Sequence, residues 1–118
     1  EVVKTYPDLK PSDYAFTGLV DNVIIGMGGV SMYWPGVGEA WCILTKDVNK
    51  YPIESVRCIR QIIEKAFIDL QLWRLEATVR TDFDRAKKFI EHLGFECEGK
   101  KKKFAPDGCD VYMYSRII

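Results

Sequence analysis

The segment from Leu75 to Gly99, LEATVRTDFDRAKKFIEHLGFECEG, constrains the fold of this chain more than any other part of its sequence. Apolar and polar residues alternate at its start, which predicts a strand over 72–80. After Thr81-Asp82, apolar residues recur at intervals of three and four, as in an amphipathic helix, and Gly94 stands where such a helix ends. A further strand follows the Gly94-Phe95 junction. This order of elements predicts a mixed α and β protein.

The same patterns predict the other elements. Apolar residues at helical spacing from Val56 to Leu70 indicate a long amphipathic helix, which Ser55 or Asn49 would cap. Residues 1–18 are expected to form a loose lead-in, so that one domain spans 1–118 with its core over 19–118. Glycines 26, 28 and 29 and the Pro35-Gly36 and Pro106-Asp107-Gly108 segments are expected to form turns or bulges. The remaining predicted strands cover 20–25, 30–34, 39–45, 95–104 and 111–117.

The charge and apolar content exclude several functional classes. The 118 residues contain 17 Lys and Arg against 17 Asp and Glu, so no overall field favours binding to nucleic acid or to an anionic membrane. The run from Lys100 to Lys103 lies on a predicted strand, where successive side chains point to opposite faces, and we interpret it as a solvated strand. No apolar run approaches the roughly 20 residues of a membrane-spanning helix. We therefore expect a cytoplasmic protein.

The four cysteines (Cys42, Cys58, Cys97 and Cys109) show no C-x-x-C spacing. A zinc site needs closely spaced ligands, so no metal is predicted. A chain of this length can bury a core without disulfides, and we expect reduced thiols.

Three stretches resemble the GNAT superfamily of N-acetyltransferases, and the resemblance extends from Val20 to Ile117. They are GEAWCILT before the long helix, RAKKFIEHLGFECEG after the following strand, and KKFAPDGCDVYMYSRI near the end. The resemblance implies an α/β (α+β) fold: a mostly antiparallel central sheet flanked by helices, with an abbreviated N-terminal part. Among GNAT-like proteins, the chain is most similar to the compact ones of tailed bacteriophages, some of which are virion components.

This resemblance implies acyl transfer from acetyl-coenzyme A (acetyl-CoA) to a primary amine of a small molecule or peptide. Glu39 would accept the amine proton, and Tyr112 or Tyr114 would protonate the leaving thiolate. Backbone N–H groups of 41–44 would contact the thioester carbonyl, Thr81 would contact the pantetheine arm, and the phosphates would lie over 46–57. The residues expected to bind the cofactor are Trp41, Cys42, Ile43, Leu44, Lys46, Lys50, Ser55, Arg57 and Thr81.

Three departures from the family pattern favour an alternative. The segment from Leu44 to Cys58 holds no glycine, where family members carry a glycine-bearing phosphate loop. Thr81-Asp82 replaces an asparagine that usually contacts pantetheine, and Ile90 stands where many members have a tyrosine acid. The alternative is a catalytically degenerate GNAT-fold protein that binds a protein partner, in the host cytoplasm or in a virion if it is phage-encoded. A homodimer is compatible with both hypotheses.

Each candidate residue also has a purely structural interpretation. Glu39 would then be a solvated carboxylate at a strand start, and Tyr112 and Tyr114 would pack as ordinary amphipathic aromatics. Tyr33, together with Trp34, would either wall an acceptor pocket or pack in the same way. His92, the one histidine, would lie near a helix C-terminus and gain from the helix dipole without a catalytic role.

Overall fold

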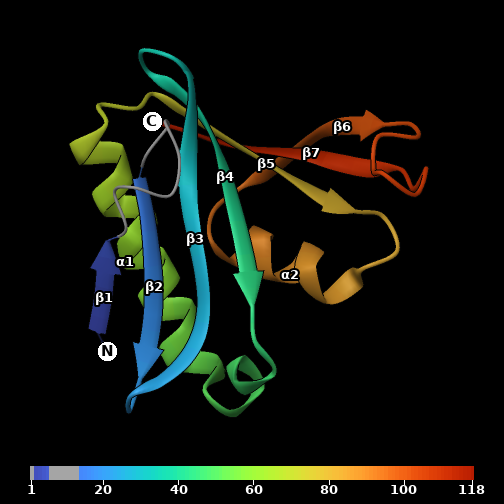
Figure 1. Cartoon of the computed structure of the whole chain (residues 1–118). Coiled ribbons are helices and arrows are strands. Elements are labelled where there is room, and N and C mark those ends of the chain that lie inside the picture. Colours follow the sequence, from blue (N-terminus) through green and yellow to red (C-terminus); the bar gives the residue numbers. More distant parts are fainter. Residues whose placement is uncertain (1, 6–13) are drawn as a thin grey trace.

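The computed structural model describes residues 2–5 and 14–118, which form a seven-stranded sheet with helices packed against it (Figure 1). The strand order across the sheet is β1-β2-β3-β4-β5-β7-β6. All neighbouring strands are antiparallel except β4 and β5. The mixed fold with a mostly antiparallel sheet is thereby confirmed. In chain order the elements are β1 (Val2–Thr5), β2 (Tyr14–Val20), β3 (Val23–Trp34), β4 (Val37–Leu44), the 3-10 helix η1 (Lys46–Lys50), α1 (Pro52–Asp69), β5 (Arg74–Arg80), α2 (Asp84–His92), β6 (Glu96–Lys101) and β7 (Val111–Ile117).

The parallel pair in the middle of the sheet is short. The pairs Val37↔Arg74, Gly38↔Leu75 and Glu39↔Glu76 join β4 to β5, although both strands continue beyond them. Past Glu39, β4 stays paired with β3, and past Glu76, β5 stays paired with β7. The two strands therefore diverge, as Figure 1 shows. We call this divergence, formed by residues 40–44 of β4 and 77–80 of β5, the splay.

Both α-helices pack on one face of the sheet, which we call the helix face. A buried cluster joins Leu75, Ala77 and Val79 of β5 to Ala66 and Phe67 of α1. Residues within α2 and just after it complete this cluster: Phe89, Ile90, Leu93 and Phe95. In Figure 1, α1 lies behind β2 and β3, and α2 lies below β5 and β7. We call the opposite face, which no helix of the described residues covers, the open face.

The N-terminal part differs from the prediction. The sequence predicts a strand over 20–25 and a turn at glycines 26–29, but the chain turns at Asp21-Asn22 and β3 continues through those glycines. Asp21 and Asn22 have φ values of 51° and 65°, a left-handed conformation that Asp and Asn tolerate better than most residues. The predicted lead-in over 1–18 contains β1 and most of β2, while positions 6–13 lie outside the described residues.

The glycines of β3 are required by close packing instead of by a turn. A Cβ atom at Gly29 would lie 2.4 Å from the carbonyl oxygen of Tyr14 and 2.9 Å from the indole of Trp41. A Cβ atom at Gly28 would lie 2.8 Å from the carbonyl oxygen of Trp41. Glycine therefore lets β2 and β4 approach β3 closely and lets the Trp41 ring lie against it.

The predicted caps of α1 are wrong. The helix begins at Pro52, its N-cap residue is Tyr51, and no side chain caps it. Proline suits the first helical position because the N–H it lacks would have no partner within the helix. Ser55 lies one turn inside the helix and is buried, and Asn49 instead accepts a hydrogen bond from Arg85 of α2.

We predict that Gly29→Ala destabilises the protein by about 1–3 kcal/mol, because the added methyl group meets backbone and ring atoms that cannot move aside. Urea unfolding followed by tryptophan fluorescence measures this change. Gly18→Ala is the matched control, because a Cβ atom there meets Ile25 at 3.4 Å, an ordinary contact. Equal stability of the two variants would contradict the packing argument.

Candidate active site at the splay

The β4 side of the splay presents unpaired main-chain groups. The carbonyl oxygen of Gly36 accepts a hydrogen bond from Arg74 N at 3.1 Å, so Gly36 directs its main-chain groups toward β5. Because the direction alternates along a strand, Cys42 and Leu44 direct their N–H groups toward the splay. Trp41 and Ile43 direct theirs toward β3. Of the four backbone N–H groups of 41–44 that were predicted to contact a thioester carbonyl, two therefore face the splay, where β4 has no partner strand.

The β5 side follows the same alternation. Thr81 N donates to Asp110 O at 3.1 Å on the far side of the strand, and its hydroxyl lies 3.8 Å from Cys109 Sγ. Thr81 therefore directs its main-chain N–H away from the splay. Its contact with a pantetheine arm stays a prediction. Thr78, three residues earlier, directs its main-chain groups into the splay instead. Main-chain direction alternates from residue to residue along β5, and this alternation is the sequence feature that could have identified Thr78. It can be used only once the neighbouring strands of β5 are known.

Two glutamates meet where the strands begin to diverge. Glu39 and Glu76 are the last residue pair of the parallel ladder, and both side chains lie on the open face. Glu76 is held by Arg74, with 2.8 Å between Nε and Oε2, whereas Glu39 makes no ion pair with any described residue. Tyr33 lies beside them, and its burial, the charges of Glu39 and Glu76 and a hydrogen bond to Glu39 raise its pKa. Glu39 is thus the carboxylate at this point that no cation of the described residues holds.

Arg74 connects this point to the neighbouring hairpin. Its two Nη atoms donate to the Glu98 carboxylate at 2.9 and 2.6 Å, and Ser115 Oγ donates to the same carboxylate at 2.5 Å. These hydrogen bonds, that of Arg74 above all, lower the pKa of Glu98 to about 2. The open face is therefore cross-linked from β5 to β6 and β7, which keeps Glu76 in a fixed position beside Glu39.

The two candidate tyrosines share the helix face of β7. Tyr114 is 1% exposed and its hydroxyl donates to Glu91 Oε2 at 2.8 Å; burial and this hydrogen bond raise its pKa to about 12. Tyr112 is half-buried, with Lys87 Nζ 4.7 Å and Lys100 Nζ 5.7 Å from its ring centroid. β5 lies between β7 and the splay, so the structure brings neither tyrosine to a strand that borders it.

The segment after β4 offers few main-chain donors. Val48 N and Tyr51 N donate within η1 and its end, both at 3.2 Å, and Ser55 N donates to Tyr51 O at 2.9 Å. Pro52 has no N–H group. The Ser55 hydroxyl is buried and, within the described part of the chain, has no hydrogen-bond partner. Lys50 pairs with Asp47 at 3.3 Å, and Lys46 is exposed in the same 3-10 helix.

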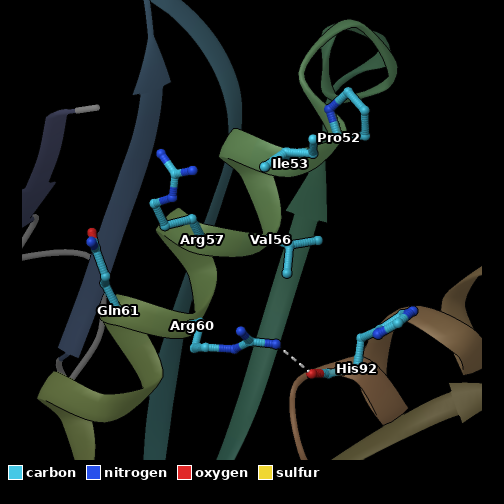
Figure 2. A pocket seen from close by; sticks show the side chains of 7 residues that line it. All are labelled: Pro52, Ile53, Val56, Arg57, Arg60, Gln61 and His92. Carbon is cyan, nitrogen blue, oxygen red and sulfur yellow. Dashed lines mark hydrogen bonds between the residues drawn. The ribbon is translucent and has the colours of Figure 1, made fainter.

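A pocket of about 420 Å³ lies along α1 (Figure 2). Arg57 is the one predicted cofactor residue that lines it, and Arg57 makes no ion pair or side-chain hydrogen bond with any described residue. Arg60 crosses toward α2, where its Nη2 donates to the main-chain oxygen of His92 at 2.8 Å. His92, at the end of α2, therefore lines the pocket and also holds Arg60 through its main-chain carbonyl. The full lining consists of Pro52, Ile53, Val56, Arg57, Arg60, Gln61 and His92.

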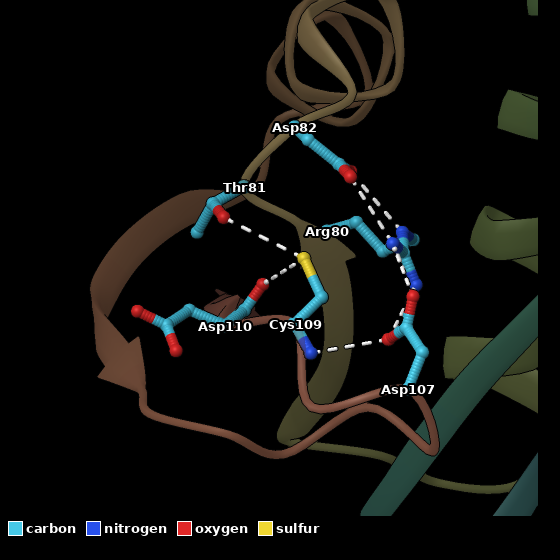
Figure 3. Close-up of polar contacts among 6 residues, drawn as sticks. All are labelled: Arg80, Thr81, Asp82, Asp107, Cys109 and Asp110. Carbon is cyan, nitrogen blue, oxygen red and sulfur yellow. Dashed lines mark hydrogen bonds and ion pairs between the residues drawn. The ribbon is translucent and has the colours of Figure 1, made fainter.

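A separate cluster fixes the turn between β5 and α2 (Figure 3). The Arg80 guanidinium lies between the carboxylates of Asp82 and Asp107, with ion-pair distances of 3.1 and 2.9 Å. Asp107 also accepts a hydrogen bond from Cys109 N at 3.1 Å. Arg80 thus joins the end of β5 to the loop between β6 and β7, and we interpret this cluster as structural.

In residues 2–5 and 14–118, no group of three or more His, Cys, Asp or Glu side chains is arranged to hold a metal ion. The helices in these ranges include none whose length and apolar content would let it span a bilayer.

Solved structures of acetyltransferases share this fold. They include a GNAT-family acetyltransferase from Bacillus anthracis (TM-score 0.76, 19% identity, covering 89% of this chain and 66% of that one). The ribosomal-protein-S5-alanine acetyltransferase from Vibrio fischeri matches with a TM-score of 0.74 and 25% identity over 87% of this chain and 60% of that one. A variant of the spermidine N-acetyltransferase SpeG from Vibrio cholerae matches with a TM-score of 0.75 and 18% identity over 87% and 64%.

The chain therefore has the GNAT acetyltransferase fold, as the sequence predicts. It spans just under two thirds of the length of these three structures. No protein-family model and no curated protein matches its sequence. The similarity to bacteriophage proteins stays a prediction.

We predict that Glu98→Gln reduces the acid sensitivity of the fold. A carboxylate whose pKa falls on folding stabilises the protein above its unfolded pKa of about 4.3, and this contribution is lost as the pH falls through the folded value. The wild type should therefore lose stability between pH about 4.3 and about 2, and Glu98→Gln should lose less, from a lower starting value at pH 7.

Urea unfolding at several pH values measures both curves. Glu96→Gln is the control, because Glu96 is exposed on the same strand and has no ion-pair partner among the described residues. Parallel curves for Glu98→Gln and the wild type would show that Arg74 does not hold Glu98 in solution.

Proposed function

We propose that this protein transfers an acetyl group from acetyl-CoA to a primary amine. The observation that carries the proposal is the divergence of β4 and β5 immediately after Glu39 and Glu76, with main-chain N–H groups directed into the gap. Such fixed donors stabilise negative charge on a carbonyl oxygen at no reorganisation cost. A bound acetyl-CoA supplies an activated thioester, and Cys42 N–H is the donor that we assign to its carbonyl.

We assign to Glu39 the role of the base that accepts the proton of the amine. It is half-buried at the narrow end of the splay and has no cationic partner among the described residues, so its carboxylate is free to accept a hydrogen bond from a protonated amine. Glu76, held by Arg74, adds a second negative charge that attracts the same cation. Tyr33 stands beside Glu39 and completes a polar site on the open face.

The fit of acetyl-CoA differs between its two ends. The splay suits the acyl and pantetheine part, because Cys42, Leu44 and Thr78 offer main-chain partners along both strands. The segment from Thr45 to Pro52 suits phosphates poorly through its backbone, because its N–H groups are mostly used within η1. Phosphate binding would therefore depend on side chains, of which Arg57 is the one free in a pocket.

We assign Tyr112, in preference to Tyr114, as the acid that protonates the leaving thiolate. The Tyr114 hydroxyl is enclosed and held by Glu91. Tyr112 is half-buried, and no carboxylate accepts its hydroxyl in the described structure. Its side chain lies on the helix face beside Val79, its cross-strand partner on β5.

Among acceptors, spermidine and an alanine-terminated peptide are suitable first probes, because structural neighbours are named for such substrates. Both present a cationic amine to the Glu39–Glu76 pair. Binding of acetyl-CoA by calorimetry, followed by release of free thiol in the presence of each amine, tests the proposal. A cytoplasmic location and a single domain over 1–118 stay predictions that accompany it.

Glu39→Gln is expected to lower kcat by about 10²–10⁴-fold and to leave the affinity for acetyl-CoA unchanged, because the amide accepts no proton. Steady-state kinetics with a thiol-detecting reagent measure this effect, with Glu96→Gln as the control. Unchanged turnover of Glu39→Gln would remove Glu39 from the mechanism.

The two tyrosines are separated by their phenylalanine variants. Tyr112→Phe should lower kcat, by about 10-fold or more, with little change in melting temperature. Tyr114→Phe should lower the melting temperature, because it removes a buried hydrogen bond to Glu91, and should change kcat little. The opposite pattern would reassign the acid to Tyr114.

A second candidate is a catalytically degenerate GNAT-fold protein with a protein partner. The observation that favours it is the loss of backbone phosphate donors in η1 together with Ile90 on α2. A ligand that binds only the folded state must stabilise it, so a melting temperature unchanged by millimolar acetyl-CoA would favour this candidate. Detection of the protein in purified phage particles would then test this candidate directly.

A further inference from the structure

We propose that the turn end of the hairpin formed by β6 and β7 binds single-stranded nucleic acid. We call this surface the basic end of the hairpin, and it consists of the lysine run from Lys100 to Lys103 together with Phe104. The inference goes beyond the proposed function and does not depend on it, because β5 and β7 separate β6 from the splay.

The structure changes the interpretation of the lysine run as a solvated strand. That interpretation requires successive side chains to alternate between the two faces of a strand. However, β6 ends at Lys101, and Lys102 and Lys103 belong to the turn that follows, where Lys103 has a φ of 53°. Alternation therefore separates only Lys100 and Lys101, and the other two lysines lie at the tip of the hairpin. In Figure 1 this tip lies away from α1 and from β1 to β3.

The acidic residues near the basic end are already engaged by other groups. Asp107 forms an ion pair with Arg80, and Asp110 accepts a hydrogen bond from the main-chain N–H of Lys103 at 2.8 Å. Glu98, earlier on β6, is held by an arginine of β5. None of the four lysines forms an ion pair with a carboxylate of the described residues. The basic end therefore keeps a local positive charge in a chain whose overall charge is balanced.

A lysine of α2 extends this charge onto the helix face. Lys87 Nζ lies 4.7 Å and Lys100 Nζ lies 5.7 Å from the centroid of the Tyr112 ring. The face of an aromatic ring attracts a cation but does not neutralise its charge. Two elements that are distant in sequence thus bring ammonium groups to one location. A row of separate positive charges suits a nucleic-acid backbone, which carries one negative charge on each phosphate.

An exposed ring beside the lysines favours nucleic acid over an acidic peptide. Phe104 directly follows the run and is 52% exposed, and Lys101 Nζ lies 4.7 Å from its ring centroid. The bases of a single strand stack on such rings while neighbouring cationic groups bind the phosphates. An acidic peptide requires the ammonium groups alone. In a duplex the faces of the bases are covered by their neighbours, so the ring selects a single strand.

The loop that carries the basic end is held in shape by its own main chain. Ala105 N donates to Cys109 O at 3.0 Å, and Gly108 N donates to Ala105 O at 2.8 Å. Arg80 attaches the same loop to β5 through Asp107 (Figure 3). A loop that is already ordered loses less conformational entropy when it binds a ligand.

Fluorescence anisotropy of a labelled DNA single strand of about 12 nucleotides, titrated with the full chain at several salt concentrations, tests the inference. The double variant Lys102→Gln/Lys103→Gln is expected to weaken binding and to reduce the slope of log K against log salt by about 1.4, because about 0.7 is lost for each phosphate contact. Phe104→Ala is expected to weaken binding about 10-fold and to leave the slope unchanged, because it removes stacking and no charge.

Lys65→Gln is the matched control, because Lys65 pairs with Asp69 at 2.6 Å on α1 and should not affect binding. The melting temperatures of all variants should stay close to that of the wild type, since the substituted side chains are exposed or make no ion pair at the basic end. Absence of binding by the wild type at low salt would overturn the inference, as would equal binding by the lysine variant. Displacement of the strand by an equal concentration of a polyglutamate peptide, with no effect of Phe104→Ala, would also overturn it and would indicate an acidic protein partner.

Discussion

The short parallel ladder between β4 and β5 depends on a corner where the chain returns from α1. The carbonyl oxygen of Gly36 accepts hydrogen bonds from both Trp73 N (2.9 Å) and Arg74 N (3.1 Å), and the Trp73 ring lies against Gly36. Gly36 has a φ of 89°, and a Cβ atom there would lie 2.3 Å from that ring. This corner places β5 beside β4 for three residue pairs, and the position of the splay follows from it.

The core then holds the two strands apart. Leu75, Ala77 and Val79 are buried against α1 and the segment after α2, and burying each large apolar side chain contributes about 1.5–3 kcal/mol. The edges of β4 and β5 that face the splay gain no such partner. Cys42 is exposed and Thr78 is half-buried, so water or a ligand can hydrogen-bond to their main-chain groups. The packing that stabilises the fold thus also creates the splay.

Charge is arranged locally in a chain whose overall charge is balanced. On the open face, Arg74 forms ion pairs with both Glu76 and Glu98, whereas Glu39 has no ion pair with any described residue. On the helix side, two arginines line a pocket that contains no acidic residue. The two charge clusters have opposite signs and lie on different elements, so one is suited to a cationic amine and the other to phosphates.

The sequence determined those features that depend on near neighbours along the chain. Apolar spacing predicted α1 and the unit of β5 and α2, and alternation placed Tyr112 and Tyr114 on one face of β7. The glycines of β3 misled the prediction, because a glycine needed for close packing against Tyr14 and Trp41 looks in sequence like a glycine needed for a turn. The pairing of Glu39 with Glu76, the exposure of the Cys42 and Thr78 main chains and the approach of Arg60 to His92 were decided by the tertiary structure alone. They depend on strand register and helix packing, which bring together residues that no local pattern connects.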